Sequence, residues 1–282
     1  MLVDMESSPA GTPATEPQAD AARRRTRWHS VSSTREYEGC PRRYRFGYID
    51  RRPKDRPAPV SWRFGSAVHA GLEAAYRQRL DDADGGIVEQ LRAARDAVDR
   101  CWRELGLDAD ADDEGRARAA WLVGRAVTRD VLAIERILDV EAPLRDTICE
   151  AERIIGFADL VLAREGGVVE IVDHKVTRDR TDPERLRGDI QLNLYGQLAR
   201  LRWPWARQVR VTHHYPTGPA AVSATLHEDS TAAALDRVHR TAAVIRRDTE
   251  FLPVPGPRCG HCPWQPSCPD GLRGPTVDAG GR

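Results

Sequence analysis

The sequence predicts an α/β protein in which several helices precede a small β-sheet, and three observations support this fold class. Up to about residue 140, apolar side chains recur at helical spacing, whereas from about residue 145 short runs of β-branched residues are separated by turn residues. A further helical segment divides these strands into two groups, an order typical of one α/β domain that carries a helical insertion. The 282 residues are enough to bury one substantial core.

The chain before the sheet is expected to be helical once a polar N-terminal tail has ended. Residues 1–27 are rich in Pro, Ala, Thr and charged residues, and we expect them to be disordered. Ser32 or Ser33 can cap a short helix that runs towards Cys40 and is disturbed at Pro41. Three amphipathic helices are then expected at about 64–80, 86–105 and 114–139, with the helical insertion covering about 82–142.

The second half of the chain is expected to supply the strands of the sheet. Three short strands, TICEAERII, ADLVLA and VVEIVDHK, are separated by turn residues at Gly156 and at Glu165–Gly167. A helix then begins with Pro183 in its first turn. The remaining elements are expected in the order helix 183–202, strands 208–215 and 221–227, and helix 231–248.

Composition and charge exclude several functional classes. The formal net charge is zero, which argues against the uniformly basic surface of a non-specific nucleic-acid coat. No apolar run is long enough to span a bilayer and the N-terminus lacks a secretory signal, so we expect a cytoplasmic protein with no membrane partner. Cysteines there are more often ligands or free thiols than disulfides. All but two of the 43 basic residues are arginine, and neither Lys54 nor Lys175 follows a glycine as a P-loop lysine does, so no ATPase is expected.

Two carboxylates and a lysine are expected to converge at one end of the sheet. Asp159 lies in one strand, and Asp173 and Lys175 lie in the next. Because side chains alternate along a strand, Asp173 and Lys175 point to one face and His174 to the opposite one. Carboxylates bind Mg²⁺ or Mn²⁺, which polarises a phosphoryl oxygen and activates a water that the lysine could orient. An isolated D-x-K pattern is more often an ordinary ion pair, and these residues alone leave that alternative open.

Three further polar residues could support such a site. His69 stands four residues after Gly65 on an expected helix and can offer a nitrogen ligand, although a lone helical histidine is more often structural. Gln191 and Tyr195 are four residues apart and therefore share one face of the helix expected at 183–202. A Gln–Tyr pair at that spacing is common and indicates little by itself.

The order G-x3-H, G-F-A-D, D-H-K and Q-x3-Y resembles the RecB-like branch of the PD-(D/E)XK nuclease superfamily. The resemblance implies a restriction-endonuclease-like αβββαβ core in a nuclease domain spanning 28–270, with a flexible tail over 271–282. It assigns Lys175 to catalysis, with Gln191 and Tyr195 supporting the site. Many members carry a basic residue after the first aspartate, where this chain has Leu160. It implies that the divalent metal is bound by His69, Asp159, Asp173 and the carbonyl of His174.

Four of the six cysteines lie in loop contexts at the two ends of the domain. Cys259, Cys262 and Cys268 form C-x2-C-x5-C in a proline-rich segment, and Cys40 lies far upstream in GCPRRY. Zinc and iron–sulfur clusters both use four cysteines, and the spacing alone leaves both open. The other two cysteines are expected to be core thiols, one in a helix and one in a strand: Cys101 and Cys149.

One cysteine before the nuclease core and three after it is an arrangement similar to that of iron–sulfur RecB-like nucleases. These include the nuclease half of AddB-type helicase–nucleases and a CRISPR-associated nuclease family, and the string S-x4-Y-x2-C-P-x2-Y from Ser32 to Tyr44 also fits them. The resemblance implies a 4Fe–4S cluster on Cys40, Cys259, Cys262 and Cys268, held by segments 37–44 and 257–270. Such a cluster would join the N- and C-terminal segments and close a very long loop.

The sequence therefore predicts a Mg²⁺- or Mn²⁺-dependent deoxyribonuclease, in the first instance an exonuclease, that acts on DNA ends or single strands in recombination, repair or processing. A helicase or an integrase is the expected partner. Two alternatives stay open: a CRISPR spacer-processing nuclease, and a non-catalytic DNA-binding module that retains the cluster. The second is disfavoured because every expected catalytic position is filled. A basic strip near Cys40 is expected to contact the DNA backbone through Arg42, Arg43, Arg45, Arg51 and Arg52.

Overall fold

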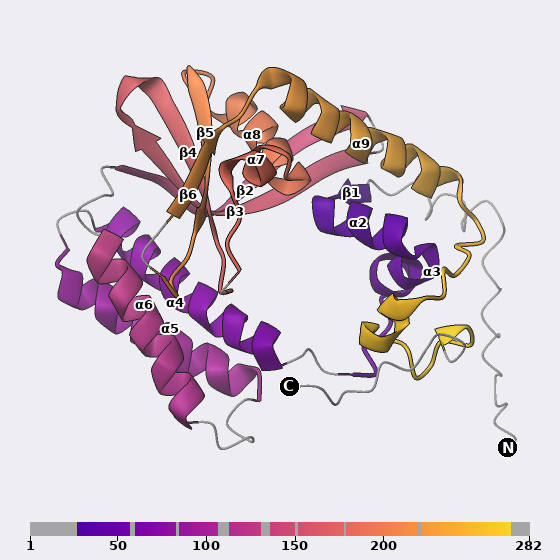
Figure 1. The fold of residues 1–282 in the computed structure, drawn as a ribbon, viewed down its shortest axis with the longest axis horizontal. Coiled ribbons are helices and arrows are strands. Elements are labelled where there is room, and N and C mark those ends of the chain that lie inside the picture. Colours follow the sequence, from indigo (N-terminus) through magenta and orange to yellow (C-terminus); the bar gives the residue numbers. More distant parts are fainter. Residues whose placement is uncertain are drawn as a thin grey trace, which may run out of the picture.

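The fold is organised around a six-stranded mixed sheet, with helices on both of its faces (Figure 1). The tails expected at 1–27 and 271–282 lie outside the described residues, except for Arg27 and Gly271. No helix in the described part of the chain is long and apolar enough to cross a membrane. The computed structural model describes residues 27–56, 60–82, 85–106, 113–130, 136–149, 152–177, 179–218 and 221–271.

The sheet is centred on β3, which pairs with three other strands. β2 and β4 run antiparallel to β3, and β1 runs parallel to its first residues. β5 lies parallel to β4, and β6 closes the edge antiparallel to β5. The strands are β1 (Arg27–His29), β2 (Arg136–Cys149), β3 (Glu152–Arg164), β4 (Val168–His174), β5 (Gln208–His214) and β6 (Ala221–Thr225).

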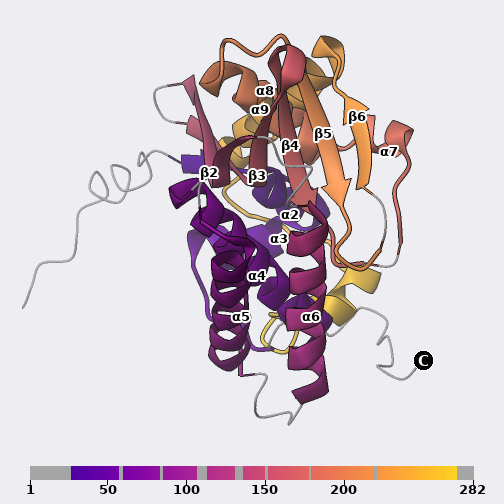
Figure 2. The ribbon, with the colours of Figure 1, turned by 90° about the vertical axis from the view of Figure 1, so that its left-hand side faces the viewer.

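The two faces of the sheet pack against different helices because side chains alternate along β3 and β4. Val161 and Ile171 belong to a core shared with α7, α8 and α9, whereas Leu160 and Val172 belong to a second core shared with α4, α5 and α6. Figure 2 shows α4, α5 and α6 grouped together on one side of the sheet. The helices are α4 (Val60–Asp81), α5 (Ile87–Glu104), α6 (Asp113–Asp130), α7 (Pro183–Arg187), α8 (Ile190–Arg202) and α9 (Glu228–Arg247).

The two ends of the described chain meet in a separate lobe, which we call the cysteine lobe and define as residues 31–56 and 248–271. Figure 1 shows the C-terminal segment, in yellow, beside α3. The Tyr37 hydroxyl donates a 2.7 Å hydrogen bond to Asp248 Oδ2, and the Trp264 indole N–H donates to the Pro53 carbonyl at 3.0 Å. The lobe contains α2 (Val31–Gly39), α3 (Pro41–Tyr44), the π-helix η1 (Arg45–Ile49) and the 3₁₀ helix η4 (Pro257–His261).

The expected α/β class is confirmed, and α4, β2, β3, β4, α8 and β5 follow one another in the αβββαβ order. The hairpin expected at Glu165–Gly167 is present, and Gly166 and Gly167 both adopt the positive φ that glycine tolerates best. Helices α5 and α6 lie between α4 and β2 in the chain, within the expected insertion. The domain boundaries themselves stay predictions.

Two expectations about the strands are wrong. The helix expected to reach residue 139 ends at Asp130, and Ile137 lies in β2, because its apolar spacing suits a strand as well as a helix. Gly156 is not a turn: β3 runs through it, so the segments expected as two strands form one strand, and TICEAERII contributes to both β2 and β3. The glycine is needed within the strand because the ring of Tyr195 occupies the space that a side chain at residue 156 would fill.

Two expectations about the helices also need correction. The helix expected at 183–202 is broken into α7 and α8, because Asp189 caps α8 by accepting hydrogen bonds from the N–H groups of Gln191 and Leu192 at 2.7 and 3.1 Å. The cap of α2 is Ser30 rather than Ser32 or Ser33, although Ser33 completes the capping box.

Candidate active site

One face of α4, the middle of β3, the end of β4 and Glu141 of β2 line a cavity of about 830 Å³. Helix α4 contributes residues spaced by whole turns, because positions three and four apart share one face of a helix. β3 and β4 contribute the polar residues that lie just beyond the last pair between these two strands, Leu160 with Val172. The lining includes the predicted residues His69, Asp159, Asp173, His174 and Lys175.

Asp159 and Asp173 are brought together by the antiparallel pairing of β3 with β4. The last paired positions are Leu160 and Val172, so the two aspartates stand opposite each other one residue further on. Asp159 is fixed by the His174 backbone N–H, which donates a 2.7 Å hydrogen bond to its Oδ2. The hairpin therefore places two carboxylates together where the pairing of β3 with β4 ends, as the predicted hairpin at Gly166–Gly167 required.

Asp173 is contacted by three polar side chains. The Lys175 Nζ lies 2.6 Å from Asp173 Oδ2, and the Gln191 amide donates to Asp173 Oδ1 over 3.4 Å. His213 of β5 places its Nε2 3.6 Å from the same Oδ2. Burial lowers the pKa of His213, which favours its neutral form beside this carboxylate. His213 was not singled out from the sequence, because its contact depends on the parallel pairing of β4 with β5.

Tyr195 supports the site through packing and hydrogen bonding. Its ring fills the space above Gly156, and it is hydrogen bonded to the backbone of Phe157 and to Gln191. Burial is the main cause that raises the pKa of Tyr195 to about 12, so the phenol keeps its proton. Gln191 and Tyr195 thus share the helix face that their spacing predicted, and Gln191 alone of the two contacts Asp173.

A compact set of metal-ligand atoms lies on the α4 side of the cavity. His69 Nδ1 is 3.5 Å from Asp159 Oδ2. Ligand atoms of His69, Glu141 and Asp159 lie within 4.8 Å of one another, and they form the one such group in the described part of the chain. Glu141 was not identified from the sequence. Its neighbours pair as Val140 with Leu160 and Ala142 with Ala158, which places Glu141 opposite Asp159.

Without a cation, the carboxylates of Glu141 and Asp159 repel each other across a small space. Burial and the negative charge of Asp173 raise the pKa of Asp159 to about 7. Burial and the charge of Asp159 raise the pKa of Glu141 to about 7 as well. Burial lowers the pKa of His69, which leaves its ring available as a neutral nitrogen donor. Carboxylates that repel one another around a small space, with a neutral imidazole, fit a divalent cation.

The ring of His174 points away from Asp173 and Lys175, as expected. It stacks on Tyr76 of α4 at 5.7 Å between ring centroids, and its Nδ1 lies 2.8 Å from Nδ1 of His214. The backbone of His174, in contrast, faces the cavity, where it is hydrogen bonded to His69 and to Asp159. Only the backbone of His174 is therefore placed to contact a metal.

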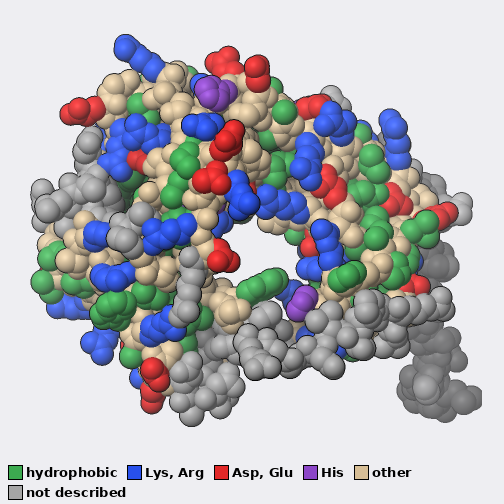
Figure 3. All heavy atoms as spheres, in the orientation of Figure 1, with side chains coloured by type: hydrophobic (Ala, Val, Ile, Leu, Met, Phe, Trp, Pro, Cys, Tyr) green, Lys and Arg blue, Asp and Glu red, His purple; other side chains and the backbone are tan. Residues whose placement is uncertain are grey.

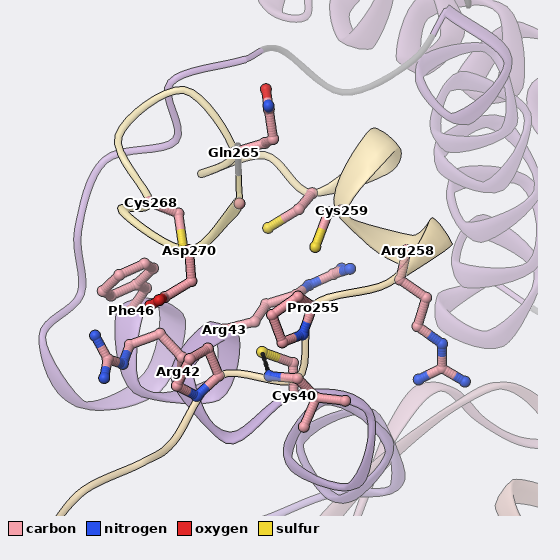
Figure 4. A pocket seen from close by; sticks show the side chains of 14 residues that line it. Cys40, Arg42, Arg43, Phe46, Pro255, Arg258, Cys259, Gln265, Cys268 and Asp270 are labelled. Carbon is pink, nitrogen blue, oxygen red and sulfur yellow. Dashed lines mark hydrogen bonds between the residues drawn. The ribbon is translucent and has the colours of Figure 1, made fainter. Parts of the chain in front are cut away.

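The four predicted cluster cysteines, Cys40, Cys259, Cys262 and Cys268, line one pocket in the cysteine lobe. Figure 4 shows three of them, Cys40, Cys259 and Cys268, around this pocket. The Val254 backbone N–H donates to the Cys40 sulfur at 3.5 Å, and burial raises the pKa of Cys262. Cys101 is a partly buried thiol packed against the α4–α6 core, as expected, whereas the side chain of Cys149 lies outside the described residues.

The arginines of the expected basic strip lie in different surroundings, and their role in DNA binding stays a prediction. Arg42 and Arg43 line the cysteine pocket, and Arg42 donates to the Phe251 carbonyl at 2.9 Å. Arg45 pairs with Asp50, and Arg52 donates to Ser267 at 3.1 Å. A second cavity of about 850 Å³ nevertheless gathers basic side chains beside the active site: Arg43, Arg51, Arg52, Lys54 and Arg56.

A family model described as the PD-(D/E)XK nuclease superfamily matches residues 29–269. The chain belongs to the PD-(D/E)XK nuclease superfamily. Its family is therefore one of nucleases. Such enzymes hydrolyse the phosphodiester bonds of DNA and typically use divalent metals.

Two solved structures resemble the chain. A candidate exonuclease from Eubacterium rectale has a TM-score of 0.51 and 15% sequence identity, covering 84% of this chain and 86% of that one. The structure of SSO0001 has a TM-score of 0.35 and 13% identity, covering 86% of this chain and 85% of that one. The comparison with curated proteins found no match to the sequence. At 15% identity, the likeness to the Eubacterium rectale protein shows a shared fold.

Proposed function

We propose that the protein is a Mg²⁺- or Mn²⁺-dependent deoxyribonuclease that cuts DNA at ends or in single strands. The observation that carries this proposal is the convergence of Asp159, Asp173 and Lys175 with His69 and Glu141 on one cavity. An ordinary strand ion pair would account for Asp173 and Lys175, but not for two further carboxylates and a histidine around the same space. Family membership supports the same chemistry.

In this proposal His69, Asp159, Asp173 and the carbonyl of His174 hold the cation, with Glu141 as an additional ligand. The cation supplies Lewis-acid polarisation of the phosphoryl oxygen and lowers the pKa of a bound water. Gln191 holds Asp173 by the 3.4 Å hydrogen bond. The Lys175 ammonium, 2.6 Å from Asp173 Oδ2, is placed to orient the attacking water or to stabilise charge on the phosphoryl oxygens.

The proposal is tested by cleavage of end-labelled single- and double-stranded DNA with Mg²⁺ or Mn²⁺. Asp173→Asn and Lys175→Ala should each reduce cleavage by at least about a hundredfold, because each removes a group that acts on the reacting atoms. Asp236→Asn, on the exposed face of α9, is the matched control and should cleave as the wild type does. Wild-type protein that binds DNA but never cuts it with either metal would instead favour the non-catalytic binding module.

We further propose that Cys40, Cys259, Cys262 and Cys268 bind a 4Fe–4S cluster. The four thiols share one pocket, and the N–H of Val254 donates to the Cys40 sulfur, a contact that suits a thiolate ligand. Four thiols can hold either zinc or an iron–sulfur cluster, and the resemblance to iron–sulfur RecB-like nucleases favours the cluster.

The cluster is tested by visible absorbance and by metal analysis of anaerobically prepared protein. Wild type should be brown and contain iron and sulfide, and Cys262→Ser should lose the colour. Cys101→Ser, which removes a thiol in the α4–α6 core, should stay brown. Colourless wild type loaded with zinc would contradict the cluster while leaving the nuclease proposal intact.

The mode of cutting, the cellular setting and the partner are proposed on separate grounds. The Eubacterium rectale protein is named as a candidate exonuclease, which supports exonuclease action here. A role in recombination, repair or processing and a helicase or integrase partner rest on the resemblance described above, whereas the cytoplasmic location rests on the composition of the sequence. Release of mononucleotides from one labelled end, compared with internal nicks in a circular single strand, separates exonuclease from endonuclease action.

A further inference from the structure

Trp62, in the first turns of α4, lies where two cavities adjoin. Ser61 and Trp62 line the active-site cavity and also the second, basic cavity. These two residues are therefore on any direct route between the basic side chains and the catalytic carboxylates. Their place follows from α4 itself, which carries Trp62 and His69 on the same side of the helix.

The exposure of Trp62 is unusual for so large an apolar side chain. At 66% it is the most exposed of the large hydrophobic residues in the described chain. Within those residues no aromatic ring or guanidinium stacks on it, whereas Trp28 and Trp121 are each covered by arginine. Leaving an indole in water forgoes the free energy that its burial would provide, so an open face at this position indicates a surface kept free for a ligand.

The small residues beside Trp62 leave room for that ligand. Ser61, Gly65 and Ser66 share the cavity-facing side of α4, and a side chain at Gly65 would meet nothing within 4 Å. Along a helix that rises about 1.5 Å per residue, Trp62 lies roughly 10 Å from His69, which is about three spacings of a stacked nucleic-acid strand. A base stacked on Trp62 would thus lie within a few nucleotides of the catalytic carboxylates.

The basic cavity on the other side of Trp62 fits a phosphate backbone. Arg51 and Lys54 line it and make no ion pair with any described residue, so their charges are available. In the space-filling view, the molecule has an opening near its centre, and Lys and Arg side chains occupy part of its margin beside acidic, apolar and histidine side chains (Figure 3). Cations that hold phosphates next to an open aromatic face are the combination used to bind single-stranded nucleic acid.

We propose that Trp62 is a stacking platform for an unpaired nucleobase, which positions a DNA strand between the basic cavity and the active site. This inference rests on the proposed nuclease function and names the substrate feature that the site selects. Bases within a duplex are stacked on one another and offer no free face, whereas an unpaired base does. Trp62 therefore favours single strands and frayed ends over intact duplex.

The experiment measures the affinity of a fluorescein-labelled oligothymidylate for wild type and Trp62→Ala, without a divalent metal so that nothing is cut. Loss of one stacked base should weaken binding by roughly five- to a hundredfold. The same strand made of abasic sites should bind both proteins equally, because it has no base to stack. Trp62→Phe should restore most of the affinity for the normal strand.

Trp121→Ala, which removes an indole that is 58% exposed on α6, is the matched control and should bind both strands as wild type does. The proposal is overturned if Trp62→Ala binds the normal strand as tightly as wild type. It is also overturned if Trp62→Ala binds the normal strand and the abasic strand more weakly than wild type by the same factor, since that pattern indicates a structural role for Trp62. Because this assay needs no cleavage, its result is separate from whether the wild type cuts DNA.

Discussion

At the scale of single residues, Glu141 changes the description of the metal site most. Its backbone has a φ of 48°, a left-handed conformation that costs free energy in a residue other than glycine. Glu141 lies in β2 opposite Asp159, and its carboxylate is within 4.8 Å of the ligand atoms of His69 and Asp159. Strained backbone at a carboxylate that repels its neighbour is reasonable where a bound cation offsets the repulsion.

The raised pKa values of Asp159 and Glu141 predict a particular pH dependence of stability. Both carboxyls have ordinary pKa values near 4 and values of about 7 in the folded, metal-free protein. Between these limits the folded state binds more protons than the unfolded state, so stability falls as pH rises from about 4 to about 7. Thermal unfolding of chelator-treated protein should therefore give a lower Tm at pH 8 than at pH 5.5, and Mn²⁺ should raise the Tm more at pH 8.

Glu141→Gln removes one of the two raised carboxyls, so its metal-free Tm should vary less with pH and its Mn²⁺ affinity should fall at least tenfold. Glu165→Gln, in the exposed β3–β4 turn, is the control and should follow wild type. Parallel metal-free Tm profiles for Glu141→Gln and wild type would contradict the raised pKa of Glu141, and an unchanged Mn²⁺ affinity would show that Glu141 is not a ligand of the cation.

At the scale of elements, the packing of α8 on β3 fixes the strand that carries Asp159. Gly156 lies in the middle of β3, and the Tyr195 ring on α8 packs directly over it. The same tyrosine is hydrogen bonded to the backbone of Phe157 and to Gln191, which in turn contacts Asp173. Because Gln191 and Tyr195 share one face of α8, that face contacts both β3 and the carboxylate of Asp173.

Gly156→Ala should destabilise the protein and impair catalysis together. The added Cβ would overlap Cε1 of Tyr195 and lie 2.7 Å from its Cδ1, a clash that costs about 1–3 kcal/mol when a packed core must adjust. Gly124→Ala on α6 is the control, because its nearest neighbour would be Leu91 Cδ2 at 3.7 Å, an ordinary contact. That variant should be stabilised by up to about 1 kcal/mol through helix propensity. Urea unfolding measures both, and equal stability of the two variants would contradict the packing argument.

At the scale of the whole molecule, the two segments of the cysteine lobe, residues 31–56 and 248–271, are held together by contacts that do not involve the cysteines. Tyr37, Tyr44 and Phe251 form its aromatic core, against which Ile245 of α9 packs. Arg52 and Trp264 bridge its N- and C-terminal segments. A cluster would therefore add to contacts that already unite the two ends of the described chain. The lobe also carries the basic side chains of the second cavity beside the active site.

Arg51 and Lys54 should account for a measurable part of the salt dependence of DNA binding. Each phosphate neutralised on a single strand contributes about 0.7 to the slope of log affinity against log salt. The double variant Arg51→Ala, Lys54→Ala should lower that slope by about 1.4. Arg185→Ala, Arg240→Ala, which removes two exposed charges elsewhere, should leave the slope unchanged. A slope unaltered by the first pair would place the DNA backbone elsewhere.

The sequence by itself determined the α/β class, the β3–β4 hairpin and the opposed placement of Asp159 and Asp173. These follow from local rules, since strand alternation and the glycine-rich turn act over a few residues. The order of polar motifs also predicted the family that the chain was found to belong to. The same local rules could not locate the end of α6 or the continuity of β3, because Ile137 and Gly156 suit more than one structure.

Only the tertiary structure decided which other residues join the site. Glu141 reaches the cavity through pairing between β2 and β3, and His213 reaches Asp173 through pairing between β4 and β5. Trp62 adjoins the basic cavity because the cysteine lobe folds back beside α4. The pairing of β4 with β5 and the folding of the cysteine lobe join segments far apart in sequence, which no local pattern encodes. Glu141 lies in the β2–β3 hairpin opposite Asp159, and sequence reasoning missed it because it predicts a turn at Gly156 rather than a continuous β3. Asp159, Asp173 and Lys175, in contrast, lie within the hairpin that the sequence did predict.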